Sequence, residues 1–277
     1  MQLASIRQRI GNTEQIESII VAMRAIAATH LQDARRHVEA IRRHRASVTE
    51  AMGEALALLE ETQRPDPAGD GADGWLLIVV GAGQGFCGLY NETVVQAALA
   101  CAGEDDAEPD YIVMGQRCLT EFQARGRSPV LGFDQAVRAA DVPHLASRVA
   151  DGLYERLAAG NVRRVAVLHA EPEAGAPVMK QLIPFDYDRI ERPAGRNRPL
   201  IQMPPLALLA ELVTEYVFSE LCEALMLGFA AENDARMQAM LRARSNVSHV
   251  IDDLKRGYHQ ARQEQMTAEI LELSESF

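Results

Sequence analysis

The sequence predicts an α+α/β fold in which the N- and C-terminal helices form a long antiparallel coiled coil, with a Rossmann-like α/β domain inserted between them. Two long proline-free segments carry apolar residues at alternating steps of three and four. Between them, short apolar runs alternate with helical stretches, as in α/β domains. We therefore expect an N-terminal coiled-coil helix over residues 1–62, a Rossmann-like domain over 75–195 and a C-terminal coiled-coil helix over 205–277.

The first segment, Ser5–Thr62, contains no proline and is rich in Ala, Leu, Glu, Arg and Gln, which are strong helix formers. Its three-four rhythm predicts a seam that faces a partner helix. The seam consists of Ala34, Val38, Ile41, Val48, Met52, Ala55 and Leu59, with Arg45 as its polar member. Because a polar residue weakens a seam locally, Arg45 marks a place where the rod could meet a partner.

The middle of the chain begins after Gln63–Gly74, a segment rich in Pro, Gly and Asp that indicates a domain boundary. Apolar runs predict four strands, at Trp75–Val80, Tyr111–Met114, Val165–His169 and Val178–Phe185. Helical stretches are expected near Glu92–Cys101, Arg117–Arg125 and Pro143–Ala159. Strands that alternate with helices predict a largely parallel sheet covered on both faces.

A second breaker-rich boundary, Gly195–Pro205, precedes another proline-free segment from Leu206 to about Leu273. Its expected seam is Met237, Met240, Arg244, Val247, Ile251, Leu254, Tyr258, Ala261, Gln265 and Ala268. A single helix with an apolar stripe is not stable in water. The two terminal helices are therefore expected to pair with each other.

Charge and cysteine content limit the classes of function that this protein can have. The net charge of −11 disfavours nucleic acid as a partner. Residues 1–45 hold eight arginines against four acids, whereas residues 205–277 hold six basic residues against twelve acids, so the two ends could attract each other. No apolar stretch suggests a membrane span or a signal peptide, which predicts a protein of the cytosol or of a cytosolic membrane face. The spacing of the four cysteines, Cys87, Cys101, Cys118 and Cys222, predicts reduced core residues.

One motif points to a different function. Gly83-Gln84-Gly85-Phe86-Cys87-Gly88 fits GxGxxG and follows the strand Trp75–Val80, the setting of a dinucleotide-binding turn. An NAD(P)-dependent oxidoreductase built on Trp75–Phe185 is therefore the alternative. The acid that would bind the ribose is missing, because Tyr111–Met114 is followed by Gly115-Gln116-Arg117. A tight structural turn is the favoured interpretation.

No set of residues predicts catalysis or metal binding. His30, His37 and His44 repeat every seven residues, whereas a helical metal pair usually needs a spacing of four. Asp252 and Asp253 point about 100° apart on a helix and do not share a site. We expect no cofactor and no metal.

Taken together, the two ends and the glycine turn resemble the gamma subunit of F-type ATP synthases, in a divergent bacterial branch. The resembling residues are Ile6–Ile10, Ile20–Ala28, Gly85–Asn91, Glu232–Met240, Asn246, Ile251–Leu254, Tyr258, Ala261–Glu264 and Thr267–Ile270. The order of these elements covers the whole chain. The chain departs from the family at Ala82–Gly85, where a charged contact of the family is absent. It departs again at Ile201–Pro205, where the family often has residues that contact the c-ring.

The resemblance implies a non-catalytic rotor shaft that couples hydrogen ion (or sodium) transport through a membrane ring to ATP synthesis or hydrolysis at the beta subunits. It implies alpha, beta and epsilon subunits and the c-ring as partners, and a peripheral place on the cytoplasmic face of the bacterial inner membrane. It also implies contacts with the beta subunits through Met23, Arg24, Arg236, Gln263 and Thr267.

Overall fold

The computed structural model describes residues 2–59, 74–102, 108–160, 162–172, 176–191 and 200–275. The predicted boundary Gln63–Gly74 lies outside these residues except for Gly74, and the boundary Gly195–Pro205 lies outside them as far as residue 199. The chain forms two compact units. The terminal unit joins Met1–Ala28 to Arg236–Phe277, and the sheet unit comprises Thr29–Ala235.

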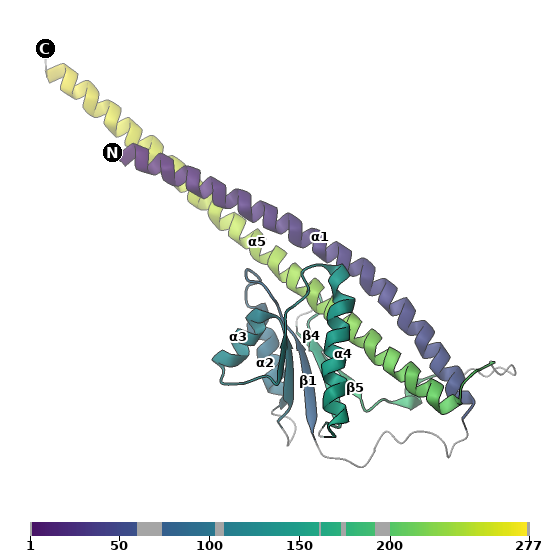
Figure 1. The fold of residues 1–277 in the computed structure, drawn as a ribbon. Helices are drawn as coiled ribbons and strands as arrows, with labels where there is room; N and C mark the ends of the chain where they lie inside the picture. Colours follow the sequence, from purple (N-terminus) through teal and green to yellow (C-terminus); the bar gives the residue numbers. More distant parts are fainter. Residues whose placement is uncertain are drawn as a thin grey trace. The chain divides into compact units, whose positions relative to one another are not determined.

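Two long helices contribute to both units (Figure 1). Helix α1 runs over Gln2–Ala57 and helix α5 over Pro205–Glu275, close to the two helices that the sequence predicts. The described part of the chain contains no helix that is long and apolar enough to cross a membrane.

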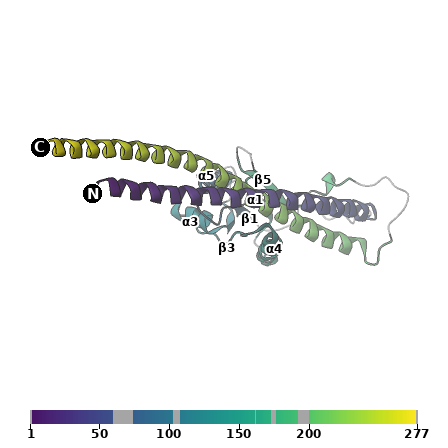
Figure 2. The ribbon, with the colours of Figure 1, turned by 90° about the horizontal axis from the view of Figure 1, so that it is seen from above.

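In the terminal unit α1 and α5 run side by side (Figure 1 and Figure 2). Two ion pairs join them, Glu17 with Arg244 at 3.7 Å and Glu14 with Lys255 at 3.1 Å. The earlier residue of α1 pairs with the later residue of α5, so the helices are antiparallel. On α5 the predicted seam is buried or half-buried at Met237, Met240, Val247, Ile251, Leu254, Tyr258 and Ala261, and exposed at Arg244, Gln265 and Ala268.

In the sheet unit the predicted seam of α1 is confirmed. Ala34, Val38, Val48, Met52, Ala55 and Leu59 are buried, and Ile41 and Arg45 are half-buried. The part of this seam toward the C-terminal end of α1, around the fully buried Met52, packs with Leu209 of α5 and with Ile190. The two helices are again antiparallel here, because Arg45 of α1 meets Glu220 of α5, whereas the earlier His30 meets the later Phe229.

The sheet has five strands in the order β3-β2-β1-β4-β5. They are β1 (Trp75–Val80), β2 (Asp110–Met114), β3 (Leu131–Phe133), β4 (Arg164–His169) and β5 (Val178–Ile183). The first four are parallel, with Ile78 of β1 beside Ile112 of β2 and Val167 of β4, and β5 is antiparallel to β4. The largely parallel sheet is confirmed. Strand β3, which has three residues with Gly132 at its centre, was not among the predicted strands.

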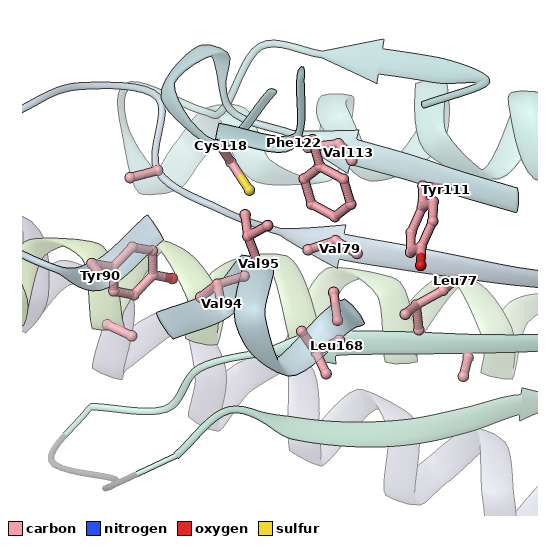
Figure 3. Packing of buried hydrophobic residues seen from close by; sticks show 14 of the residues in the cluster. Leu77, Val79, Tyr90, Val94, Val95, Tyr111, Val113, Cys118, Phe122 and Leu168 are labelled. Carbon is pink, nitrogen blue, oxygen red and sulfur yellow. The ribbon is translucent and has the colours of Figure 1, made fainter. Parts of the chain in front are cut away.

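Three further α-helices cover the sheet: α2 (Tyr90–Ala102), α3 (Gln116–Ala124) and α4 (Val142–Ala158). Short 3-10 turns occur at Ala139–Asp141 and Tyr187–Arg189. Alternate side chains of the strands, such as Leu77 and Val79, pack against α2 and α3 (Figure 3). The opposite side chain, Val80, packs against Gly228 of α5, where an added Cβ would lie 2.3 Å from the Val80 Cγ1. This close approach requires glycine and brings α5 directly onto the sheet.

Candidate functional site

The glycine turn after β1 is a structural turn closed by the chain's own carboxylate. The backbone N–H groups of Gly83 and Gln84 donate to the two carboxylate oxygens of Glu232 on α5, over 3.4 and 3.5 Å. Glu232 is only 4% exposed. In a dinucleotide-binding turn these N–H groups would face a pyrophosphate. Here the anion is part of α5.

The rest of the turn is fixed from the other side. The N–H of Ala82 donates to the Asn91 side chain over 2.9 Å, and the Gln135 amide donates to the carbonyl of Gly81 over 3.2 Å. Phe86 has a φ of 64°, a left-handed conformation that is uncommon for a residue of its size, and the residue is 68% exposed. The turn therefore presents an aromatic ring to solvent.

The carboxyl edge of β1 and β4 is where a Rossmann-like sheet binds its ligand. In this chain a pocket of about 290 Å³ lies there, and α5 forms one of its walls. Its lining includes two acidic residues, Glu171 and Asp234. Negative charge at this place disfavours a pyrophosphate. No acid follows β2 at the ribose position either, since α3 begins at Gln116 directly after Gly115.

A second polar contact joins α5 to α2. The Tyr90 hydroxyl donates to the carbonyl of Gly228 over 3.2 Å. Burial and the nearby Glu232 carboxylate raise the pKa of Tyr90 well above its usual value, so the phenol keeps its proton.

A cluster of five charged side chains, which we name the junction cluster, joins α1, α5 and β5. It consists of Arg42, Arg45, Lys180, Glu220 and Glu223. Lys180 Nζ lies 2.5 Å from Glu220 Oε2, and Arg45 Nη1 lies 3.2 Å from Glu220 Oε1. Arg42 Nε lies 2.5 Å from Glu223 Oε1, and Arg45 also pairs with Glu223. Each carboxylate thus contacts two cations.

The two carboxylates of the junction cluster lie away from solvent, with side-chain exposures of 2% for Glu220 and 8% for Glu223. Burial by itself would raise the pKa of Glu220, but hydrogen bonds from Lys180 and Tyr216 outweigh it and hold this pKa below its usual value. Glu220 is therefore ionised at neutral pH. Burial and the hydrogen bond to Glu220 raise the pKa of Tyr216.

The junction cluster corrects the interpretation of Arg45. Its place as a break in the seam predicted contact with an outside partner, whereas Arg45 meets two glutamates of its own chain. A similar contact joins His44 to Glu215 over 2.9 Å. The charge bias between residues 1–45 and 205–277 was the signal for these contacts. It could not identify Glu220 and Glu223, because the same segment also contains acids such as Glu211, Asp252 and Asp253, which are exposed.

The five residues expected to contact the beta subunits are spread along the terminal unit. Met23 and Arg24 are half-buried on α1. Arg236 is only 8% exposed and has an interaction within the chain. Gln263 and Thr267 are exposed one turn apart on α5, and the Thr267 hydroxyl donates to the Gln263 carbonyl over 2.9 Å.

The histidines and cysteines singled out in the sequence lie in surroundings that indicate structural roles. His30 stacks near Phe229, and His37 contacts the carbonyl of Asp33. No group of three potential ligands that could hold a metal occurs among the described residues. Cys87, Cys118 and Cys222 are buried and Cys101 is half-buried, so three of the four lie in the core as expected. Burial raises the pKa of the Cys118 and Cys222 thiols to about 12.

Comparison with known proteins agrees with this architecture over the whole chain. The model of the ATP synthase family matches residues 2–276. The chain is 26% identical to the ATP synthase gamma chain of Pelotomaculum thermopropionicum and 29% identical to that of a Cyanothece species, and each alignment covers 98% of this chain and 96% of the relative.

Solved structures show the same fold at lower identity. The rotor of the Euglena gracilis mitochondrial ATP synthase matches with a TM-score of 0.62 at 14% identity, covering 96% of this chain and 99% of that one. A chain of the Tetrahymena thermophila central stalk and c-ring matches with a TM-score of 0.56 at 17% identity, covering 81% of this chain and 99% of that one. With the family model matched almost from end to end, this chain belongs to the ATP synthase gamma family.

Proposed function

We propose that this chain is the central rotor shaft of a rotary ATP synthase, which couples ion flow through a membrane ring to ATP synthesis or hydrolysis at catalytic beta subunits. The observation that carries the proposal is the family match over residues 2–276. The antiparallel pair of α1 and α5 supports it, because a stiff rod is suited to transmitting torque. The functional division is the one expected from the sequence: two shaft helices, 1–62 and 205–277, and the α/β domain, 75–195.

The chain itself is proposed to be non-catalytic. Its glycine turn holds Glu232 in place of a phosphate, and the pocket lined by α2 and α5 includes two acidic residues. The oxidoreductase alternative therefore finds no support in the site, and the relatives described above are ATP synthase gamma chains. ATP chemistry then belongs to the beta subunits.

The proposed partners are the alpha and beta subunits, the epsilon subunit and the c-ring. The solved structures with this fold come from a mitochondrial rotor and from a central stalk with its c-ring. We place the assembled protein at the cytoplasmic face of the bacterial inner membrane, as a peripheral protein that reaches the membrane through its complex. Met23, Arg24, Arg236, Gln263 and Thr267 are the proposed beta-subunit contacts.

The exposure of these five residues indicates which of them are best placed to contact a beta subunit. Gln263 and Thr267 are exposed on α5 and can offer an amide and a hydroxyl to a beta-subunit loop without any rearrangement. Arg236 is mostly covered by its own chain, so it is suited to holding the helix pair in shape beneath a contact.

The proposal is tested by isolating the tagged chain from its native membranes. The expected result is copurification with alpha and beta subunits, together with ATP hydrolysis that is lost when the beta subunit is removed. A bead attached to the α/β domain of the immobilised complex should rotate while ATP is hydrolysed. Hydrolysis without rotation, or turnover by a preparation free of beta subunit, would contradict the proposal.

A further inference from the structure

In the junction cluster two buried carboxylates of one helix meet cations from two other elements. Glu220 and Glu223 come from α5, Arg42 and Arg45 from α1, and Lys180 from β5. A buried carboxylate is tolerated only when cations or hydrogen-bond donors compensate the loss of water. Each of these two carboxylates has such partners from at least one other element.

Lys180 connects the sheet to this helix pair. It lies on β5, at the edge of the sheet, where β5 pairs with β4 alone and the register shifts between Val165 and Ala166. Lys180 Nζ lies 2.5 Å from Glu220 Oε2. The edge strand therefore has a second attachment, to a helix that continues into the terminal unit.

Ion pairs and apolar contacts resist displacement differently. Apolar surfaces that slide past each other keep much of their buried area, because the hydrophobic effect has no direction. A charge-assisted hydrogen bond weakens as soon as its angle or distance changes. In a buried site the loss is larger, because water does not replace the missing partner. A rod that must transmit torque benefits from the second kind of contact.

We propose that Glu220 is a positioning residue that fixes β5 to the two shaft helices, so that torque passes between the α/β domain and the shaft through the junction cluster. On the sheet side the force acts on Lys180 through its pair with Glu220. On the shaft side Arg45 pairs with both Glu220 and Glu223 and so distributes the force between them. The torque role rests on the rotor function proposed above, whereas the attachment of β5 does not.

The torque role is tested with Glu220→Gln in the assembled complex, in membrane vesicles. The amide keeps the shape of the side chain but removes the charge. ATP hydrolysis and ion transport are measured without an opposing ion gradient and then against increasing gradients. We expect transport per ATP to match the parent complex without load and to fall about twofold or more at high load. A residue that only stabilises the fold would lower assembly and hydrolysis at every load alike.

The attachment is tested on the isolated full-length chain by amide hydrogen exchange. In Glu220→Gln the β5 amides should exchange roughly ten- to a hundredfold faster, while β1 remains protected. Lys180→Gln should have the same effect, and the double variant should add little to it. The matched control is Glu215→Gln, five residues away on α5 in an exposed pair with His44, which should leave both measurements unchanged.

Unchanged β5 exchange in Glu220→Gln would overturn the attachment. Faster exchange with equal transport per ATP at every load would overturn the torque role. A parent complex that hydrolyses ATP without driving ion transport would contradict the rotor function itself, and the exchange measurement would still decide whether Glu220 holds β5.

Discussion

The pairing of α1 with α5 differs between the two units of the molecule. In the sheet unit the helices bury charged groups, with Glu220, Glu223 and Glu232 each less than a tenth exposed. In the terminal unit they leave large apolar side chains in water, namely Ile16, Ile19, Val21, Ile26, Leu241, Val250, Met266, Ile270, Leu271 and Leu273. The ion pairs there, such as Glu14 with Lys255, are half-exposed.

This difference shows that one pair of helices serves two purposes. In the sheet unit the pair belongs to the hydrophobic core, and its charges are satisfied within the chain. In the terminal unit the apolar surface exceeds what the two helices can cover for each other, and the described α5 side chains from Arg262 onward are exposed. A surface of this kind is typical of a protein that a partner surrounds, which agrees with the proposed ring of alpha and beta subunits.

The largest expected effect is a cavity in the buried part of the helix pair. Met52 is fully buried in the sheet unit, whereas Met266 in the terminal unit is 52% exposed. Met52→Ala should lower the free energy of unfolding of the isolated chain by about 2–5 kcal/mol. Met266→Ala, its matched control, should change it by less than about 0.5 kcal/mol. Urea unfolding followed by Trp75 fluorescence measures both, and equal losses would remove the distinction between the units.

Acid should weaken the sheet unit through Glu220. The pKa of Glu220 is lowered in the folded chain, so its ionised form contributes stability above its ordinary value of 4.5, and this contribution is lost as the pH falls through the folded pKa. We expect the urea concentration at the unfolding midpoint to decrease as the pH is lowered below about 4.5. This decrease should be less steep in Glu220→Gln. Glu17→Gln, in the half-exposed pair with Arg244, is the control. Parallel pH profiles for Glu220→Gln and the parent chain would exclude Glu220 as the origin of this pH dependence.

A charge at Met23 should affect the motor more than the fold. Met23 is half-buried in the terminal unit beside Arg24. A flexible thioether contacts a changing surface without fixing one geometry, whereas a lysine could pair with a beta-subunit carboxylate in one rotary position, by roughly 1–3 kcal/mol. Met23→Lys is therefore expected to assemble and hydrolyse ATP but to transport fewer ions per ATP. Met23→Leu is the uncharged control, and an unchanged ratio in Met23→Lys would show that Met23 does not face the beta subunits.

The smallest effect on stability is expected at the exposed end of α5. Gln263→Ala and Thr267→Ala remove side chains that contact little within the described chain, so the free energy of unfolding should change by less than about 0.5 kcal/mol. If these side chains contact a beta subunit, ATP hydrolysis by the complex should fall while the isolated chain stays unaffected. Exposed Gln260→Ala, three residues before Gln263, provides a control on the same helix. Full activity in both variants would remove this contact from the proposal.

Much of this architecture follows from local patterns. The strand Trp75–Val80 has the predicted bounds, and the seam of α1 from Ala34 to Leu59 is buried as its spacing predicts. The absence of an acid after β2 was also visible in the sequence. These features depend on side-chain periodicity over a few turns or one strand, which backbone geometry fixes whatever the rest of the chain does.

Other features depend on residues that are far apart in the sequence. Glu232 reaches Gly83 across 149 residues, and Arg45 reaches Glu220 across 175. Glu220 and the exposed Glu211 belong to the same proline-free segment. They are the same residue type, so helix propensity does not distinguish them. Which of these carboxylates is buried depends on which elements pack together, and burial decides how much each charge contributes. For this reason the sequence determined the helices, the sheet and the resemblance to a rotor, and only the tertiary structure decided that the glycine turn holds a carboxylate and that Arg45 binds within its own chain.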